Sequence, residues 1–194
     1  MQHRKIVMIL GHSDESGLNG KIFAAYLAGA KKAHHEVKSF KLGEMHFDPV
    51  LSKGYREIQA LEPDLAKIQA AIQWADHLVF VFPTWWSSFP AILKGMIDRI
   101  FLPGFGFCFE ENTLLPHKLL RGKSARLIAT MDAPTWIYRW YFGAPGIKIL
   151  KRGVLEFCGI KPVRTTLIGR AQFLTDMTRN KKLLAIEKLG QKGA

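Results

Sequence analysis

Buried strands and amphipathic helices alternate along the chain. Apolar runs typical of strands covered on both faces occur at residues 4–10, 77–82 and 124–131, and shorter strand patterns at 36–42 and 162–169. Apolar positions spaced three and four residues apart predict helices between the strands. The predicted helices cover residues 19–33, 64–75, 90–101, 143–157 and 175–190. This alternation predicts a parallel sheet with helices on both faces.

Five strands and about five helices fit a doubly wound α/β fold of the flavodoxin-like type, with strand order 2-1-3-4-5. We expect residues 1–194 to form a single domain, because the chain length suits one domain and no linker interrupts it. In such sheets a ligand lies beyond the carboxyl ends of the strands, where the strand order reverses. That rule selects the loops at 11–19, 83–89 and 131–142.

The composition is that of a globular protein. Hydrophobic residues make up 48% of the chain and charged residues 23%. The apolar runs are far shorter than the roughly 20 residues that a membrane helix needs. The first residues lack the long apolar stretch and cleavage site of a signal peptide, so we expect a cytoplasmic protein.

The two cysteines, Cys108 and Cys158, both lie in apolar segments. We expect buried structural thiols and no disulfide. The sequence has no C-x-x-C, no H-E-x-x-H and no Cys/His cluster, so it predicts no metal site.

The net charge of +12 raises the question of an anionic partner. The basic residues are scattered, and none of their groups forms a block of five like charges. We favour a solvated basic surface. The alternatives are steering of an anionic small molecule and loose contact with an anionic membrane surface. No specific nucleic-acid binding is predicted, because that function needs a basic stripe.

The first loop, residues 11–19, leads from a strand into a helix N-terminus. Unpaired N–H groups and the positive end of the helix dipole suit a phosphate there. Side chains that add donors are His12, Ser13, Ser16 and Asn19. The loop is neither a Walker A motif nor G-x-G-x-x-G. A plain helix cap by Ser16 or Asn19 is the open alternative. Asp14 and Glu15 should point to solvent, since either would repel an anion.

The other two loops are aromatic. Trp85 and Trp86 follow a strand directly and offer a flat apolar wall beside backbone N–H groups, as a planar ring ligand needs. We expect one of them at a ligand surface; the alternative is a tryptophan packed into the core. The third loop carries Trp136, Tyr138, Trp140, Tyr141 and Phe142. A substrate wall, a packed aromatic segment and a dimer contact all fit that loop.

The segment at residues 82–107 closely resembles the NAD(P)H:quinone oxidoreductase family of flavodoxin-like flavoproteins. The motifs that carry the resemblance are Phe82-Pro83, Trp85-Trp86, Pro90 to Gly95, Asp98-Arg99 and Gly104 to Phe107. His12-Ser13 and Asn19 resemble the family's phosphate-contacting loop. The resemblance spans roughly residues 4 to 168.

This resemblance implies an FMN or FAD cofactor, a homodimer with the active site at its interface, and two-electron reduction of quinones by NAD(P)H with ping-pong kinetics. The flavin phosphates would meet His12, Ser13, Leu18 and Asn19, with Ser16 as a further donor. The ring would meet Pro83, Thr84, Trp85, Trp86 and Ser87, and its pyrimidine end would lie near Thr130, Met131 and Asp132.

The chain departs from the family pattern in two places. Better-known members carry Thr-Gly-Gly where this chain has Thr130-Met131-Asp132. Members with tyrosines in the substrate pocket have them where this chain has Phe107 and Phe109, so a hydrogen bond to a quinone oxygen is lost. We expect those phenylalanines and Trp136 to line the substrate pocket. The shortness of the chain favours FMN over FAD.

Tyr138 is the candidate proton donor or hydrogen-bonding partner for the reduced flavin, with aromatic packing as the alternative. Two other functions stay open. An electron-transfer flavodoxin is the first, although such carriers are typically acidic. A flavin-binding regulatory subunit of a membrane ion-efflux system is the second. The sequence names neither the physiological acceptor nor the choice between NADH and NADPH.

Overall fold

The computed structural model describes residues 3–110 and 116–194. Its centre is a five-stranded parallel sheet with the order β2-β1-β3-β6-β7. The strands are β1 (Lys5–Leu10), β2 (Glu36–Lys41), β3 (His77–Pro83), β6 (Ser124–Thr130) and β7 (Val163–Ile168). In chain order these are the five predicted strands, so the predicted order 2-1-3-4-5 and the fold class are confirmed.

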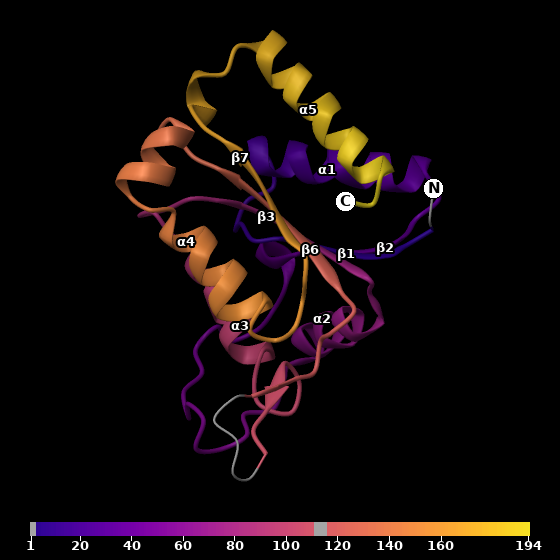
Figure 1. The fold of residues 1–194 in the computed structure, drawn as a ribbon, viewed down its shortest axis with the longest axis vertical. Coiled ribbons are helices and arrows are strands. Elements are labelled where there is room, and N and C mark those ends of the chain that lie inside the picture. Colours follow the sequence, from indigo (N-terminus) through magenta and orange to yellow (C-terminus); the bar gives the residue numbers. More distant parts are fainter. Residues whose placement is uncertain (1–2, 111–115) are drawn as a thin grey trace.

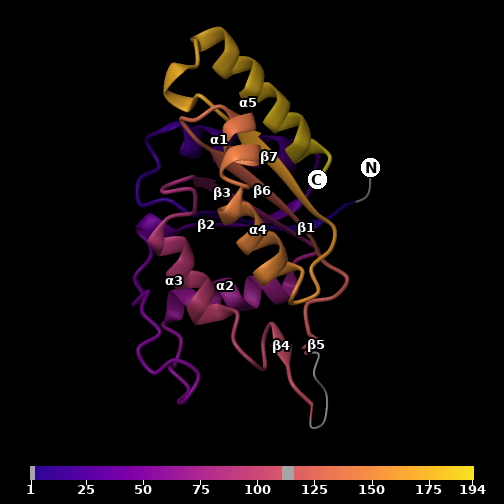
Figure 2. The same ribbon diagram turned by 60° about the vertical axis from the view of Figure 1, so that its left-hand side comes forward.

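Helices cover both faces of the sheet, as Figures 1 and 2 show. Helices α1 (Leu18–Lys32) and α5 (Asp176–Gln191) pack against each other on one face. Helices α2 (Pro63–Trp74), α3 (Ala91–Ile100) and α4 (Pro145–Lys148) lie on the other face. Short 3-10 turns follow β2 and β7, namely η1 (Leu42–Glu44) and η4 (Ala171–Phe173).

The sheet separates two apolar clusters. Ile6, Met8 and Leu10 point into the cluster beneath α1 and α5, whereas Val7 and Ile9 point into the larger cluster on the other face. This alternation follows from the two-residue period of a strand. Strands β1, β3 and β6 are buried on both faces and are mostly apolar, with His77 and Arg126 as buried exceptions near the starts of β3 and β6.

The predicted helix at 143–157 is confirmed, but it starts two residues later and is not a regular α-helix throughout. The segment begins as α4 at Pro145 and becomes the π-helix η3 (Ile149–Leu155) after one turn. Gly143 and Ala144 have φ values of +72° and +50°, and these left-handed residues keep the helix from starting earlier. The third loop also contains a π-helical turn, η2 (Ile137–Tyr141), that the sequence did not reveal.

A small antiparallel pair, β4 (Phe107–Cys108) and β5 (His117–Lys118), was not predicted either, because two-residue strands leave no periodic signal. Figure 2 shows this pair beyond α2 and α3, away from the main sheet.

Both cysteines are free; Cys158 is buried and Cys108 is half-buried. Burial raises the pKa of the Cys158 thiol to about 11. Within the described ranges, no group of three or more potential metal ligands occurs. No helix among the described residues combines the length and apolar character needed to cross a membrane.

Candidate functional site

The three predicted loops meet at the carboxyl edge of the sheet. Backbone hydrogen bonds connect them to neighbouring strands: Gly11 N–H donates to the Val81 carbonyl (2.8 Å), Thr84 N–H to Thr130 (2.7 Å) and Met131 N–H to Ile168 (2.9 Å). We call residues 11–19, 83–89 and 130–142 the carboxyl-edge site. Its position agrees with the rule that ligands bind where the strand order reverses.

Helix α1 begins at this site without a side-chain cap. Its N-cap residue is Gly17, so the alternative of a plain cap by Ser16 or Asn19 is wrong. No acidic residue lies in the first turn. The N–H groups of that turn are therefore available to an anion, and nothing in the turn itself repels a phosphate.

The preceding loop is folded onto itself through Asp14. The Ser16 N–H and hydroxyl both donate to the Asp14 carboxylate, at 2.8 and 2.7 Å, and the Asp14 N–H donates to His12 Nδ1 at 2.8 Å. The hydrogen bonds from Ser16 hold the pKa of the Asp14 carboxyl below its usual value. Asp14 and Glu15 are exposed, as predicted, and Glu15 pairs with Lys41. The Ser16 hydroxyl is engaged and must leave Asp14 to donate to a ligand.

A close backbone approach fixes the end of this loop. A Cβ on Gly20 would collide with the Glu15 carbonyl oxygen, so no larger residue fits without moving the loop. A Cβ on Gly17, three residues earlier, would meet no other atom within 4 Å.

Asn19 and Thr130 join the first loop to the third. Both are buried, and the Thr130 hydroxyl donates to Asn19 Oδ1 at 3.1 Å. Residues 111 positions apart in sequence are thus brought together. The pairing leaves the Asn19 amide group, a donor, beside the start of α1.

The tryptophan loop is a tight, strained turn. Trp85 and Ser88 exchange two backbone hydrogen bonds of 2.9 Å each, and the central residues Trp86 and Ser87 have φ values of 49° and 60°. Non-glycine residues in this region cost about 1–3 kcal/mol each and concentrate at functional sites. Neither tryptophan is in the core. Trp86 is fully exposed, and Trp85 is 46% exposed with its ring 5.4 Å from that of His12.

Tyr138 anchors this turn from below. Its hydroxyl donates to the Ser87 carbonyl (3.3 Å) and accepts from the Ile147 N–H (3.4 Å), and the Gly146 N–H reaches the same carbonyl at 3.0 Å. The ring is 3% exposed, and burial raises the pKa of the Tyr138 hydroxyl. The predicted packing role is therefore visible, and the buried hydroxyl stays protonated at neutral pH.

Two further residues predicted to contact the flavin from the third loop, Met131 and Asp132, already interact with the protein itself. Met131 is buried in the core, and the Asp132 carboxylate accepts two hydrogen bonds from Gln172, at 3.2 and 2.8 Å. The Thr84 hydroxyl oxygen is buried near Tyr138 and makes no hydrogen bond of good geometry within the described residues. A buried polar atom without a partner is rare in proteins and suits a ligand that completes its bonding.

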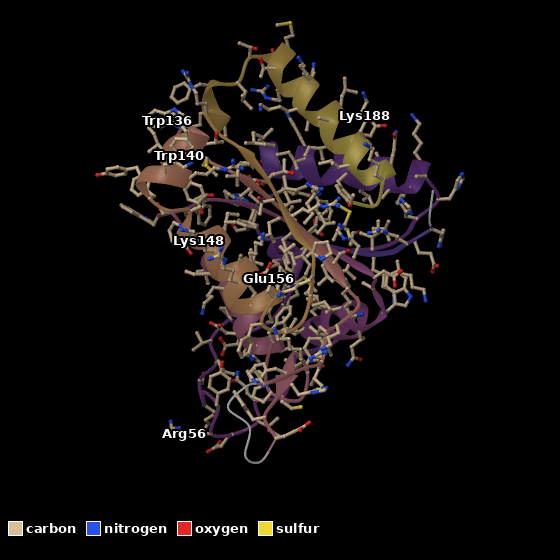
Figure 3. The ribbon with its side chains drawn as sticks, viewed as in Figure 1. Arg56, Trp136, Trp140, Lys148, Glu156 and Lys188 are labelled. Carbon is tan, nitrogen blue, oxygen red and sulfur yellow. The ribbon has the colours of Figure 1, made fainter. Side chains whose placement is uncertain are left out.

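Large apolar side chains surround the site on the outside. Figure 3 shows Trp136 and Trp140 on the upper left side of the molecule; Trp140 lies on η2, and Trp136 directly precedes η2. We call the exposed set the aromatic surface. It comprises Trp86, Trp136, Trp140, Tyr141, Phe142 and Ile149. Large exposed apolar side chains close together in the chain, as at 136–142, are typical of interaction surfaces.

The predicted substrate residues do not meet within one chain. Phe107 lines a cavity of about 230 Å³ between α3 and η3 and contacts Phe109 edge-on. Trp136 lines a different cavity, of about 360 Å³, with Arg170 and Lys182. The separation follows from the position of β4, beyond α3 and away from η2 (Figure 2).

Gly146, Ile147 and Gln172 belong to the site but were missed in the sequence. The first two contribute only backbone N–H groups, and no side-chain pattern reports such a role. Gln172 lies after β7, and no motif or periodicity connects that segment with the third loop.

Known proteins resemble the chain across nearly its whole length. A family model described as "Flavodoxin-like fold" matches residues 4–189. An uncharacterized NAD(P)H oxidoreductase of Haemophilus influenzae is 30% identical over 154 residues, 76% of this chain and 74% of that protein. NAD(P)H dehydrogenase [quinone] 1 of Cavia porcellus is 27% identical over 189 residues, 84% of this chain and 68% of that protein. The chain spans 61% of the length of a Penicillium crustosum relative.

Solved structures of other proteins show the same fold. Smu.1420 from Streptococcus mutans UA159 superposes with a TM-score of 0.83 at 30% identity, covering 96% of this chain and 98% of that one. An FMN-dependent NADH-azoreductase of Bacillus anthracis, solved in complex with FMN, gives 0.74 at 20% identity, covering 96% and 97%. The predicted resemblance to NAD(P)H:quinone oxidoreductases is confirmed by the curated relatives.

Proposed function

The chain belongs to the family with a flavodoxin-like fold, and on this premise we propose that it is an oxidoreductase that passes two electrons from NAD(P)H to quinones or similar acceptors through a bound flavin. One observation carries the proposal. The uncapped start of α1 follows one loop, and a second loop holds the strained tryptophan turn and the buried Thr84 hydroxyl, which has no hydrogen-bond partner among the described residues; both loops lie at the same edge of the sheet.

The residues present fit a flavin. The first turn of α1, with His12, Ser13, Leu18 and Asn19, would hold a phosphate, because it offers free N–H groups and no acidic side chain. Residues 83–87 would hold the ring, with the partly exposed Trp85 as an apolar wall. Thr130 would lie near the pyrimidine end, whereas Met131 and the engaged Asp132 would contribute backbone groups. We favour FMN over FAD, since the short chain has little loop to cover an adenine.

A bound flavin supplies the redox chemistry, accepting a hydride from NAD(P)H and returning two electrons to the acceptor. The chain's own residues bind and orient. Tyr138, fixed by hydrogen bonds to Ser87 and Ile147, holds the tryptophan turn in place after the end of β3. Because NAD(P)H and the quinone would use the same exposed face in turn, the kinetics would be ping-pong.

We further propose a homodimer whose interface includes the aromatic surface. One chain separates Phe107 and Phe109 from Trp136, although all three were expected at the substrate pocket. A second copy would cover the exposed aromatic side chains and bring its β4 segment to the carboxyl-edge site of the first. Residues 1–194 would form one domain of this dimer, in the cytoplasm. The competing function of the aromatic surface is loose contact with an anionic membrane surface.

Asn19→Asp tests the phosphate site without testing catalysis. The substitution keeps the acceptor for Thr130 but places a negative charge in the first turn of α1, next to the proposed phosphate. We expect FMN affinity to fall by about tenfold to 100-fold, which corresponds to about 1.4–2.7 kcal/mol. Riboflavin, which lacks the phosphate, should lose far less.

Asn180→Asp on α5 is the matched control, since Asn180 is exposed and its replacement changes the net charge equally. Binding is measured by quenching of flavin fluorescence. Equal loss of FMN and riboflavin affinity in the Asn19 variant would contradict a phosphate at α1.

A further inference from the structure

A second cavity lies at the amino edge of the same sheet, at the end opposite to the carboxyl-edge site. Its volume is about 410 Å³, within the roughly 300–1,000 Å³ typical of small-molecule sites. Residues from the starts of β1, β3, β6 and β7 line it, together with the end of the described chain. Figure 1 shows the chain ends side by side there, and the Arg4 guanidinium donates to the Gly193 carbonyl at 3.0 Å. We call it the amino-edge cavity.

Positive charge dominates this cavity. Arg4, Lys161 and Arg164 line it, and Asp76 is its one carboxylate side chain among the described residues. The Asp76 carboxylate is already engaged, because it accepts the Lys5 N–H at 3.0 Å. Across residues 3–110 and 116–194, none of the three cations forms an ion pair with a carboxylate.

A fourth cation increases the imbalance. Arg126 on β6 is the register partner of Arg164 on β7, so the two side chains leave the same face of the sheet next to each other. Arg126 is buried, donates to the Thr166 hydroxyl at 2.8 Å, and keeps its Nε without a partner among the described residues. Two adjacent guanidinium groups repel each other, more strongly in a partly buried place than in water.

His77 adds an uncharged polar group to the wall. Its ring is 3% exposed, its Nδ1 lies 2.8 Å from the Ser124 hydroxyl, and its Nε2 has no partner in the described structure. Burial and the nearby positive charges, chiefly Arg4, Arg126 and Arg164, lower its pKa to about 3. The ring is therefore neutral at physiological pH, first because it is buried and then because of the surrounding positive charge.

We propose that the amino-edge cavity binds a small organic phosphate, held by Arg4, Lys161 and Arg164. Guanidinium groups match the planar, paired oxygens of phosphates and carboxylates. Three lining cations against one engaged carboxylate favour a doubly charged phosphate monoester over a monocarboxylate. The volume exceeds what a phosphate alone fills and leaves room for an organic group. This site is independent of the proposed redox function.

The test is isothermal titration of the FMN-saturated protein with AMP, inorganic phosphate and adenosine at constant ionic strength. AMP should bind and adenosine should not. Arg164→Gln should weaken AMP binding at least tenfold. The Arg164 side chain is exposed and makes no hydrogen bond to the other described residues, so its replacement should leave the fold intact. Arg152→Gln on η3 is the control, an exposed arginine that does not line the cavity.

Histidine ring signals in NMR spectra locate the ligand. AMP should shift the His77 signals and leave those of His12, at the carboxyl-edge site, unmoved. Three results would overturn the proposal: absence of AMP binding, equal weakening by both arginine variants, and shifts at His12 alone. The protein is also tested for sedimentation with phosphatidylserine vesicles. If it sediments with them, if Arg164→Gln abolishes this and if AMP does not compete, the cavity binds a lipid headgroup and the proposal of a soluble ligand is overturned. If the protein fails to bind flavin, the same titrations and NMR spectra can be recorded on the protein as purified. The test of the amino-edge cavity therefore does not depend on the proposed redox function.

Discussion

The two edges of the sheet would bind an anion in different ways. At the carboxyl edge, the first turn of α1 offers backbone N–H groups, and the nearby carboxylates Asp14 and Glu15 point to solvent. At the amino edge, side-chain cations such as Arg4 and Arg164 gather around a cavity with one engaged carboxylate. The first edge depends on loop backbone geometry and the second on side-chain charge. Substitutions that change one property should therefore affect one edge and spare the other.

Gly20→Ala should have the largest effect, because it acts on the geometry of the carboxyl edge. The new Cβ would collide with the Glu15 carbonyl and displace the loop before α1. We expect a loss of about 1–3 kcal/mol in the free energy of unfolding and about a 100-fold loss of FMN affinity. Chemical denaturation and flavin fluorescence measure the two effects.

Gly17→Ala is the control, since the added methyl group meets open space. It should retain both stability and FMN affinity. AMP binding at the amino edge should be unchanged in both variants, and a parallel loss there would mean that the two edges are not independent.

Trp140→Glu should dissociate the proposed dimer. Trp140 is 84% exposed on η2, and a buried interface tryptophan typically contributes 2 kcal/mol or more to association. We expect the dimer dissociation constant to rise by about 30-fold or more, as measured by analytical ultracentrifugation. Leu184→Glu on the exposed side of α5 should leave the mass unchanged. A wild-type protein that is already monomeric would refute the dimer, and the membrane-surface alternative would then be tested by vesicle binding.

His77 makes the stability depend on pH through the amino edge. Its pKa in the folded protein is about 3, below the ordinary value of 6.5. As the pH falls below 6.5, His77 therefore binds a proton in the unfolded chain but not in the folded one. Stability is therefore lost on acidification, by about 2 kcal/mol at pH 5 relative to pH 7.5.

His77→Gln should remove that part of the pH dependence, measured by urea denaturation at each pH, whereas replacement of the exposed His46 should keep it. The groups that act on His77 are Arg4, Arg126, Arg164 and His35. An identical pH profile in wild type and His77→Gln would contradict this account of the ring.

Tyr138→Phe should have the smallest effect and separates two roles for the hydroxyl. As an anchor of the tryptophan turn, its loss costs about 1 kcal/mol of stability and lowers turnover about threefold, because both its hydrogen bonds are long. As a proton donor, its loss would lower turnover by about 100-fold or more at unchanged stability. Tyr141→Phe, on an exposed ring, is the control.

The sequence predicted the carboxyl edge well because that edge obeys local rules. An apolar strand followed by a loop and a helix places the loop at a known edge, and the short run from Phe82 to Phe107 carries the family's motifs together. The local details were less accessible. The left-handed Gly143 and Ala144, and the Tyr138 bond to Ser87, depend on packing between segments that no periodicity connects.

The amino edge was inaccessible from the sequence for a different reason. Arg4, His77, Arg126 and Arg164 lie far apart in the chain, and only the register of four strands brings them together. Scattered basic residues were therefore interpreted as a solvated surface. The structure revises that interpretation for Arg126, which is buried, and it places Arg4 and Arg164 at a cavity.

The central claim is that the carboxyl-edge site holds a flavin that NAD(P)H reduces and a quinone reoxidises. The most direct measurement is the visible absorption spectrum of the protein, purified and saturated with FMN, before and after anaerobic addition of NADPH and then of a quinone. The account predicts a bound-flavin spectrum that bleaches with NADPH and recovers with the quinone. A protein that binds neither FMN nor FAD, or whose bound flavin NADPH and NADH leave oxidised, would contradict it.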